Sequence, residues 1–222
     1  MPGGAVDVST GLCTGGRIVR TTGSRALREI TIEVMSATVS RSAADDAWLT
    51  ELALAAGTGD RRALEEFIRA TQRDVWRFVA HLASVEQADD LAQETYVRVL
   101  RSLPRFAGRA SARTWLLSIA RRVVVDQVRY ARSRPRTTAA VEWATAAERP
   151  APGFEDIVEL NMLLAGLDEQ RREVLLLTQV LGLSYQETAD ICGCPVGTVR
   201  SRVARAREEL IAGTREESEE TG

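Results

Sequence analysis

Two short amphipathic patterns on either side of a glycine, near the end of the chain, constrain the fold more than any other feature. Ser184 is followed three residues later by Glu187, the reciprocal capping arrangement that begins a helix, which we expect over residues 185–191. Gly193 follows at the position where a helix commonly ends in the left-handed conformation. Pro195 then fits the first turn of another helix, because the missing N–H would have no partner there. This spacing predicts a helix-turn-helix.

The second helix of this motif, predicted over residues 195–207, has one apolar face and one arginine-rich face. Val199 and Val203 are four residues apart and are expected to face inward. The polar face carries Thr198, Arg200, Ser201, Arg202 and Arg205. Such a helix enters the major groove of DNA, whereas the alternative is an ordinary helical hairpin with solvated arginines. Capping, turn and charge asymmetry together favour DNA binding.

Charge is segregated along the chain, although the formal net charge is only −2. All 29 basic residues are arginine, which, with abundant alanine, indicates the coding bias of a G+C-rich genome. Residues 97–136 contain eleven arginines and one acid, Asp126, and residues 195–207 contain four arginines and no acid. Acidic residues gather at positions 89–94 and 208–220. Segregation of this kind favours a nucleic-acid partner.

The first half of the chain predicts a compact helical bundle. Apolar residues recur at three- and four-residue steps, which predicts helices over residues 44–56, 61–82, 85–102 and 111–132. Asp60 is placed to cap the second of these, and Pro104 begins a loop in which we expect Phe106 to be exposed. The short loops between these helices favour a single bundle.

The periodicity then stops over residues 133–153, where Pro135, Pro150 and Pro152 exclude any long helix. The predicted fold class is therefore all-α, with two small helical domains joined by a flexible linker and the helix-turn-helix in the C-terminal domain. We assign residues 43–132 to the first domain, 133–153 to the linker, 154–212 to the second domain and 213–222 to an acidic tail. Residues 1–42 are predicted to be a disordered or mis-called extension, with translation starting at Met1 or near Met35.

The sequence predicts no catalytic site, no metal site and no cofactor. The three cysteines, Cys13, Cys192 and Cys194, and the single histidine, His81, do not supply a metal-ligand spacing, and the paired cysteines are interpreted as structural. We find no paired carboxylates in an apolar setting, no Ser/His/Asp set and no phosphate-binding glycine loop, which disfavours an enzyme with a helix-turn-helix tail. Because no run of about eighteen apolar residues occurs, we expect no membrane insertion and a cytoplasmic location.

Three blocks of sequence, in order, carry a family resemblance. They are residues 86–96, residues 106–121 and residues 168–210, the last containing GLSYQETA (182–189) and PVGTVRSR (195–202). Together they closely resemble the extracytoplasmic-function (ECF) sigma factors of bacteria, group IV of the sigma-70 family, of an actinobacterial, high-GC type. The resemblance spans about residues 45–210. It implies a two-domain specificity subunit of RNA polymerase that recognises the minus-ten and minus-thirty-five promoter elements and promotes DNA melting.

The resemblance also implies which residues contact core RNA polymerase. The first domain would contact the β′ clamp helices, and the second domain the β flap. The implied polymerase-binding face of the first domain consists of Asp89, Asp90, Gln93 and Glu94. An acidic face suits a basic protein partner and repels DNA, whereas the alternative is a merely solvated surface.

The implied promoter contacts fall in two groups. For the minus-ten element, where a base is flipped into a loop pocket, they are Phe106, Arg109, Ser111, Arg113, Trp115, Arg121, Arg122 and Arg129. Trp115 has apolar neighbours that favour a core position over a stacking platform, and Arg122 replaces an asparagine of many relatives, which bears on the preferred base. For the minus-thirty-five element they are Thr198, Arg200, Ser201, Arg202 and Arg205, while Arg207 is also able to pair with Glu208 and Glu209.

Two alternatives concern function and regulation. A stand-alone helix-turn-helix repressor or activator would explain residues 168–210 but neither the acidic helix nor the basic first domain. The family resemblance implies control by an anti-sigma factor. The alternative is self-occlusion, in which the acidic face of the first domain or the acidic tail covers the arginine-rich recognition helix.

Overall fold

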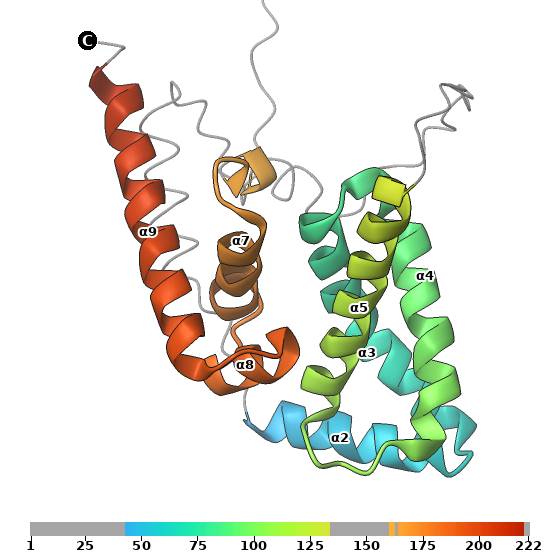
Figure 1. Ribbon diagram of the computed structural model, residues 1–222. Helices are drawn as coiled ribbons and strands as arrows, with labels where there is room; N and C mark the ends of the chain where they lie inside the picture. Colours follow the sequence, from blue (N-terminus) through green and yellow to red (C-terminus); the bar gives the residue numbers. More distant parts are fainter. Residues whose placement is uncertain (1–42, 134–159, 163, 220–222) are drawn as a thin grey trace, which may run out of the picture.

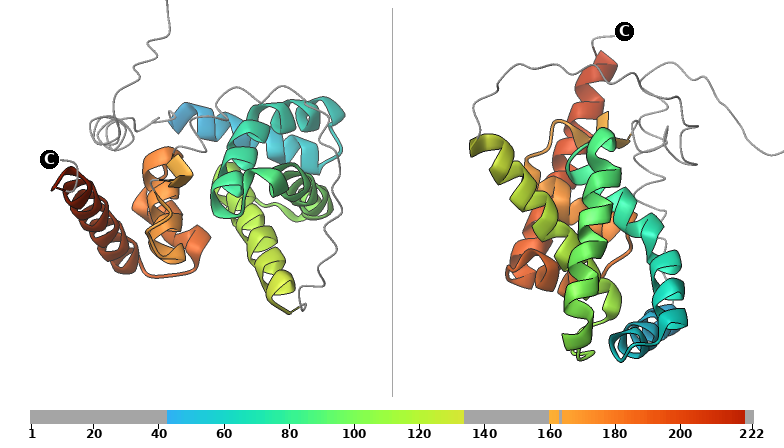
Figure 2. Two further views of the ribbon diagram at one scale, coloured as in Figure 1. Left: turned by 90° about the horizontal axis from the view of Figure 1, so that it is seen from above. Right: turned by 90° about the vertical axis from the view of Figure 1, so that its right-hand side faces the viewer.

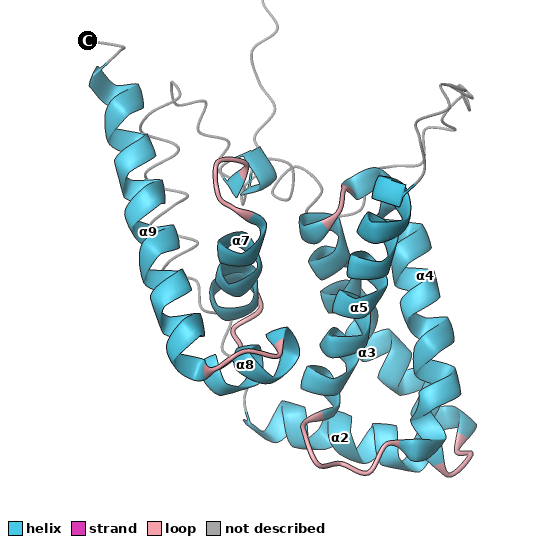
Figure 3. Ribbon diagram, viewed as in Figure 1, coloured by secondary structure: helices cyan, strands magenta, loops and turns pink. Residues whose placement is uncertain are grey.

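The computed structural model describes residues 43–133, 160–162 and 164–219, and every regular element within these ranges is helical (Figures 1 and 3). The all-α prediction is confirmed. The predictions for the N-terminal extension, Cys13, Met35 and most of the linker fall outside the described residues.

The first unit contains four long helices at nearly the predicted positions. They are α2 (Ala43–Gly57), α3 (Arg61–Leu82), α4 (Val85–Ser102) and α5 (Ala112–Ser133), with a short 3-10 turn, η1 (Leu103–Arg105), after α4. Asp60 begins α3 as expected, because its side chain accepts hydrogen bonds from the backbone N–H groups of Arg62 and Ala63. Helices α3, α4 and α5 run alongside one another, and α2 crosses one end of the group (Figure 1).

The core of the first unit lies among these helices. Its largest fully buried apolar side chains are Leu49, Phe67, Val75, Phe78, Val79, Val99, Leu116 and Leu117. Gly57 allows α2 to approach η1 closely, since a Cβ atom there would lie 2.7 Å from the carbonyl oxygen of Leu103. The end of α2 is thereby held against the loop that leads into α5.

The second unit contains the predicted helix-turn-helix. Residues around Leu160 and Leu164 pack against α7 (Glu169–Leu175) and α9 (Val196–Glu219). Helix α8 (Tyr185–Cys192) contributes to the same buried cluster. The capping box of Ser184 and Glu187 is present, and Gly193 has φ 66° and ends α8. Helix α9 is longer than the predicted 195–207; beyond residue 207, Leu210 packs against the second-unit core and Glu209 pairs with Arg171.

A single π-helical turn, η2 (Leu176–Val180), follows α7 and was not predicted. It changes the direction in which successive leucines point. Leu175 and Leu176 pack with the core of the second unit, whereas Leu177 and Leu181 join the core of the first. An ordinary helix would keep these leucines on a more continuous stripe, so the turn allows one segment to serve two cores.

The two units pack against each other. Helix α8 lies beside α5, and α9 lies on the far side of α7, away from the first unit (Figures 1 and 2). Leu177, Leu181, Leu183 and Ile191 of the second unit belong to the same buried cluster as the first-unit core. The prediction of two domains on a tether therefore omitted a shared apolar interface.

Candidate functional site

The predicted polymerase-binding face lies on the exposed side of α4. Asp89, Asp90, Gln93 and Glu94 are all exposed there. Asp89 accepts a hydrogen bond of 2.7 Å from the indole N–H of Trp76, and Glu94 accepts one of 2.8 Å from Arg98. Two of the four residues thus contact neighbouring side chains, while all four remain open to a partner.

Arg98 connects this face to α5. Its guanidinium also contacts Asp126 at 2.6 Å, and the hydrogen bonds to Asp126 and then Glu94 raise the pKa of Arg98 above its ordinary value. Asp126, the one acid in the basic stretch, therefore pairs within the first unit. The charge of the acidic face is partly balanced by a cation that holds α4 against α5.

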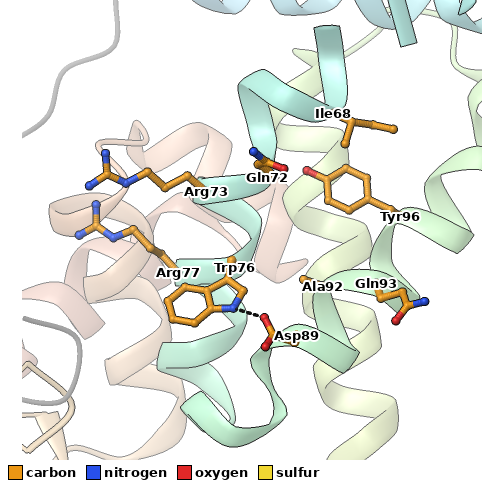
Figure 4. A pocket seen from close by; sticks show the side chains of 9 residues that line it. All are labelled: Ile68, Gln72, Arg73, Trp76, Arg77, Asp89, Ala92, Gln93 and Tyr96. Carbon is orange, nitrogen blue, oxygen red and sulfur yellow. Dashed lines mark hydrogen bonds between the residues drawn. The ribbon is translucent and has the colours of Figure 1, made fainter. Parts of the chain in front are cut away.

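A groove lies beside the acidic face, between α3 and α4. It has a volume of about 560 Å³ and shares Asp89 and Gln93 with that face (Figure 4). Its lining residues are Ile68, Gln72, Arg73, Trp76, Arg77, Asp89, Ala92, Gln93 and Tyr96. The α3 side of this groove was not predicted from the sequence. Trp76, a large aromatic residue next to the buried stripe of α3, was the available signal.

The loop before α5 places the predicted minus-ten residues near an aromatic pair. Phe106 is half-buried and packs on Trp115, with ring centroids 4.7 Å apart, so the expected exposure of Phe106 was wrong. Both rings pack against the first-unit core. Ser111 accepts a hydrogen bond from the backbone N–H of Thr114 at 3.1 Å and so caps α5.

Three of the predicted minus-ten arginines, Arg109, Arg122 and Arg129, are exposed. Two others contact the second unit instead. Arg113 is 4% exposed, and its guanidinium donates to Asp74 at 3.1 Å and to the carbonyl oxygen of Leu181 at 2.7 Å. In this arrangement Arg113 is buried and not accessible to DNA.

Arg121 makes the second arginine contact between the units. Its guanidinium forms two hydrogen bonds with the carboxylate of Glu173 on α7, one of them 3.1 Å long. Hydrogen bonding to Glu173 raises the pKa of Arg121 above its ordinary value. Glu173 is 7% exposed, so its charge depends on this partner for compensation.

The predicted minus-thirty-five residues lie on α9. Arg200, Ser201 and Arg205 are exposed, and Thr198 and Arg202 are half-buried. Arg202 donates a hydrogen bond to the side chain of Gln170 on α7.

Arg207 lies further along α9, and its guanidinium donates to Gln179 at 2.8 Å. The interpretation that Arg207 pairs with Glu208 or Glu209 was therefore wrong, because the guanidinium turns toward η2 and Glu209 is bound by Arg171.

The position of α9 also argues against one predicted form of self-occlusion, in which the acidic face of the first domain covers the recognition helix. The acidic face on α4 and the recognition helix α9 lie at opposite sides of the molecule (Figure 1). The structure instead covers part of α5 with α7 and α8, because the apolar residues of η2 and α8 complete the first-unit core.

Comparison with known proteins identifies the family. Residues 67–134 match the family "Sigma-70 region 2", and residues 157–210 match "Sigma-70, region 4". The chain is 58% identical over 176 residues to proteins described as a probable RNA polymerase sigma-C factor of Mycobacterium bovis and the ECF RNA polymerase sigma factor SigC of Mycobacterium tuberculosis. Each alignment covers 78% of this chain and 95% of the relative. This chain is an ECF sigma factor.

Solved structures agree with this sigma factor fold. One, described as CnrH in complex with the cytosolic domain of CnrY, gives a TM-score of 0.59 at 25% identity and covers 74% of this chain and 96% of that one. Another, the sigma factor RpoE in complex with the anti-sigma factor NepR from Bartonella quintana, gives 0.56 at 29% identity and covers 66% and 93%. The predicted family and function are confirmed: this is a non-enzymatic RNA polymerase subunit for transcription initiation.

The two cysteines at the turn of the helix-turn-helix have an environment that disfavours ionisation of Cys192. Cys192 and Cys194 are free thiols at the turn of the helix-turn-helix. Burial, and then the nearby charge of Glu173, raise the pKa of Cys192 to about 12.

Within the described residues there is no group of three or more His, Cys, Asp and Glu side chains able to hold a metal ion. None of the described helices has the length and apolarity needed to cross a membrane.

Proposed function

We propose that this sigma factor uses three separate surfaces in transcription initiation. The acidic face on α4 binds the β′ clamp helices of core polymerase, the loop before α5 and α5 itself bind the minus-ten element, and α9 binds the minus-thirty-five element. The second unit also contacts the β flap. The observation that carries this proposal is the arrangement of charge: the acidic face lies on the exposed side of α4, on the opposite side of the molecule from α9, while the exposed Arg109, Arg122 and Arg129 lie on α5 and the loop before it.

At the minus-ten element, exposed Arg109, Arg122 and Arg129 contact the phosphates of the separated strand. Opening a few base pairs costs a few kcal/mol, and a flipped base regains part of this by packing in the loop that Phe106 and Trp115 support. The ring pair is packed against the core, so its role is to shape and stiffen that loop.

At the minus-thirty-five element, α9 enters the major groove with Arg200, Ser201 and Arg205 outward. Arginine suits bidentate contact with guanine, whereas the serine hydroxyl contacts either a phosphate or a base. Arg202 joins this surface on release from Gln170.

Regulation in this proposal acts on the contact between the units. Arg113 contacts Leu181 and Arg121 contacts Glu173, both in the second unit, so that unit moves off α5 before the minus-ten element binds fully. An anti-sigma factor is a second partner in this proposal, supported by the similar structures of CnrH with CnrY and RpoE with NepR. The place of action is the cytoplasm.

The test is transcription with purified core RNA polymerase and a pool of genomic promoters from the source organism. We expect defined start sites with shared upstream elements, and a loss of at least tenfold in polymerase binding for the double variant Asp90→Ala, Gln93→Ala. Glu66→Ala, which removes an exposed carboxylate from α3, is the matched control. A tight footprint by the protein alone, with no polymerase binding, would instead indicate a stand-alone regulator.

A further inference from the structure

The loop that leads into α5 rests on α2. This loop, residues 103–111, begins with η1 after α4 and ends at the first turn of α5. Helix α2 crosses the end of the bundle where the loop runs (Figures 1 and 3). Thr50, Leu54 and Gly57 are spaced four and three residues apart, so they share one face of α2. Each of them lies against a different part of the loop or its junction with α5.

The first contact is at the start of the loop. Gly57 lies so close to η1 that a Cβ atom there would be 2.7 Å from the carbonyl oxygen of Leu103 and 3.8 Å from the Cα atom of Pro104. Here backbone packs on backbone, which has no flexible side chain to move aside. Leu103 is also buried in the first-unit core, so the point at which the chain leaves α4 is fixed against α2.

The second contact is at the end of the loop. The hydroxyl oxygen of Thr50 accepts a hydrogen bond of 3.0 Å from the backbone N–H of Ala112, and the hydroxyl donates to the carbonyl oxygen of Asp46. The N–H groups in the first turn of a helix have no acceptor within that helix, and Ala112 is 0% exposed. Thr50 therefore supplies the acceptor that this buried N–H needs, and it sets where α5 begins.

Between these two points the loop crosses Leu54. A Cβ atom on Gly108 would lie 3.6 Å from Cδ1 of Leu54 and 3.8 Å from the methyl group of Thr50, which is ordinary van der Waals contact. Arg109 follows directly and is exposed. The backbone that aims Arg109 into solvent is thus supported by the same face of α2.

We propose that α2 is the positioning element of the minus-ten loop. Thr50, Leu54 and Gly57 hold the loop in the shape that accepts a flipped base, and they act through the loop rather than by contacting DNA. A loop ordered in advance loses less conformational freedom on binding, so these contacts favour the open promoter. This inference rests on the proposed function of the loop and α5. It gives DNA opening a requirement that lies outside both DNA-binding surfaces and outside the acidic face.

The experiment follows promoter opening by the full chain bound to core polymerase, on a promoter identified by its mapped start site. A 2-aminopurine in the non-template strand of the minus-ten element fluoresces when it unstacks. Thr50→Val keeps the shape of the side chain but removes the acceptor for Ala112. We expect the equilibrium constant for opening to fall roughly tenfold, because a buried N–H loses its partner, while polymerase binding stays at the parent value. Thr50→Ser keeps the hydroxyl and should restore opening.

Further variants separate positioning from stability. Gly57→Ala places a Cβ atom against Leu103 and should reduce opening by a steric route. Thr95→Val is the matched control, because this buried hydroxyl donates to the carbonyl oxygen of Leu91 in its own helix rather than to the loop. It should open the promoter like the parent protein. Circular dichroism melts check folding, and Leu54→Ala, at a position 40% exposed, keeps the test valid should another variant unfold the bundle.

The outcomes distinguish this inference from the proposed function. If the folded Thr50→Val and Gly57→Ala variants open the promoter like the parent, α2 does not position the loop and the proposed function stands. Loss of polymerase binding in parallel with opening, or no recovery in Thr50→Ser, would show a general structural role and overturn the inference. If the parent protein opens no promoter with core polymerase, the proposed function fails, and the inference fails with it.

Discussion

His81, the single histidine, is buried where the two units pack, and this burial lowers its pKa. It is 1% exposed at the end of α3. Its Nδ1 lies 2.8 Å from the side-chain oxygen of Asn161, whose NH2 group donates to the carbonyl oxygen of Ala80, and its backbone oxygen accepts from Arg172. The ring Nε2 is buried without a hydrogen-bond partner, so a second proton would have no acceptor.

These surroundings predict a pH dependence of stability. Burial lowers the pKa of His81 from 6.5 to about 4, with Arg77 and Arg172 adding repulsion and Asn161 opposing the shift. Because the folded protein holds His81 neutral, the full free energy of unfolding is kept above pH 6.5. It decreases as the pH falls from 6.5 toward 4, where the unfolded chain binds a proton that the folded protein does not. Between pH 7 and pH 5 the free energy of unfolding should decrease by roughly 2 kcal/mol from this group.

Urea unfolding at successive pH values measures this loss, and NMR follows the one imidazole directly. Asn161→Ala serves as a comparison, because it removes the side chain that contacts Nδ1 while leaving the histidine in place. An imidazole that titrates near pH 6.5 in the folded protein would contradict the prediction.

At the residue scale, sequence patterns predicted positions better than partners. Val199 and Val203 are 0% and 1% exposed, as their spacing required. Arg113 and Arg121 were predicted as free DNA contacts, yet they bind Asp74, Leu181 and Glu173. Those partners come from a helix in the same unit and from a segment far along the chain, and a periodicity along one helix carries no information about them.

At the scale of elements, the turn between α8 and α9 depends on Gly193. Its φ of 66° is left-handed, and its N–H donates to the carbonyl oxygen of Ala189 at 2.8 Å. No atom lies within 4 Å of an added Cβ, so the cost of a side chain there is backbone strain alone. Gly193→Ala should therefore reduce the free energy of unfolding by about 1 kcal/mol.

The same substitution one turn later should act in the opposite direction. Gly197 lies in the first turn of α9, also with no atom within 4 Å of an added Cβ and without a positive φ. Gly197→Ala should stabilise the protein by about 0.5 kcal/mol, because it restricts the unfolded chain. Denaturant unfolding measures the free energy of unfolding of both variants. Gly193→Asn is included because asparagine adopts the left-handed conformation more readily than alanine. Equal effects at the two positions would show that the left-handed turn is not what glycine provides.

The elements that sequence reasoning described well are those with local signals. Asp60, Ser184 and Gly193 mark helix ends by hydrogen bonds and torsions that need only neighbouring residues. The π-helical turn at Leu176–Val180 has no such signal, because its leucines are divided between two cores that lie on different sides. The ion pair between Glu209, beyond the predicted end of α9, and Arg171 on another helix likewise has no local signal.

At the scale of the whole molecule, the second unit covers part of α5, the helix that the proposed function assigns to the minus-ten element. The shared apolar cluster and the Arg121–Glu173 pair hold α7 and α8 against that helix, while α9 keeps its outer arginines exposed. In the proposed function, the two DNA-binding surfaces are therefore unequal in the free protein: the surface assigned to the minus-thirty-five element is available, and the one assigned to the minus-ten element is partly covered.

Weakening the contact between the units should therefore favour an open form. Glu173→Gln leaves the shape of the side chain nearly unchanged but removes the charge that Arg121 binds. Because Arg121 is 28% exposed and reaches water, we expect a loss of roughly 2 kcal/mol, or roughly a 30-fold shift toward separated units. Small-angle X-ray scattering should show a larger radius of gyration, and amide hydrogen exchange should increase where α8 meets α5.

The control for this change is Glu208→Gln, which removes an exposed carboxylate from α9. It alters net charge equally but touches no contact between the units, so its scattering curve should match the parent protein. If Glu173→Gln also leaves the radius of gyration and exchange unchanged, the apolar cluster alone maintains closure. If the variant opens yet binds a single-stranded, AT-rich oligonucleotide no more tightly than the parent, then covering of α5 does not limit minus-ten recognition.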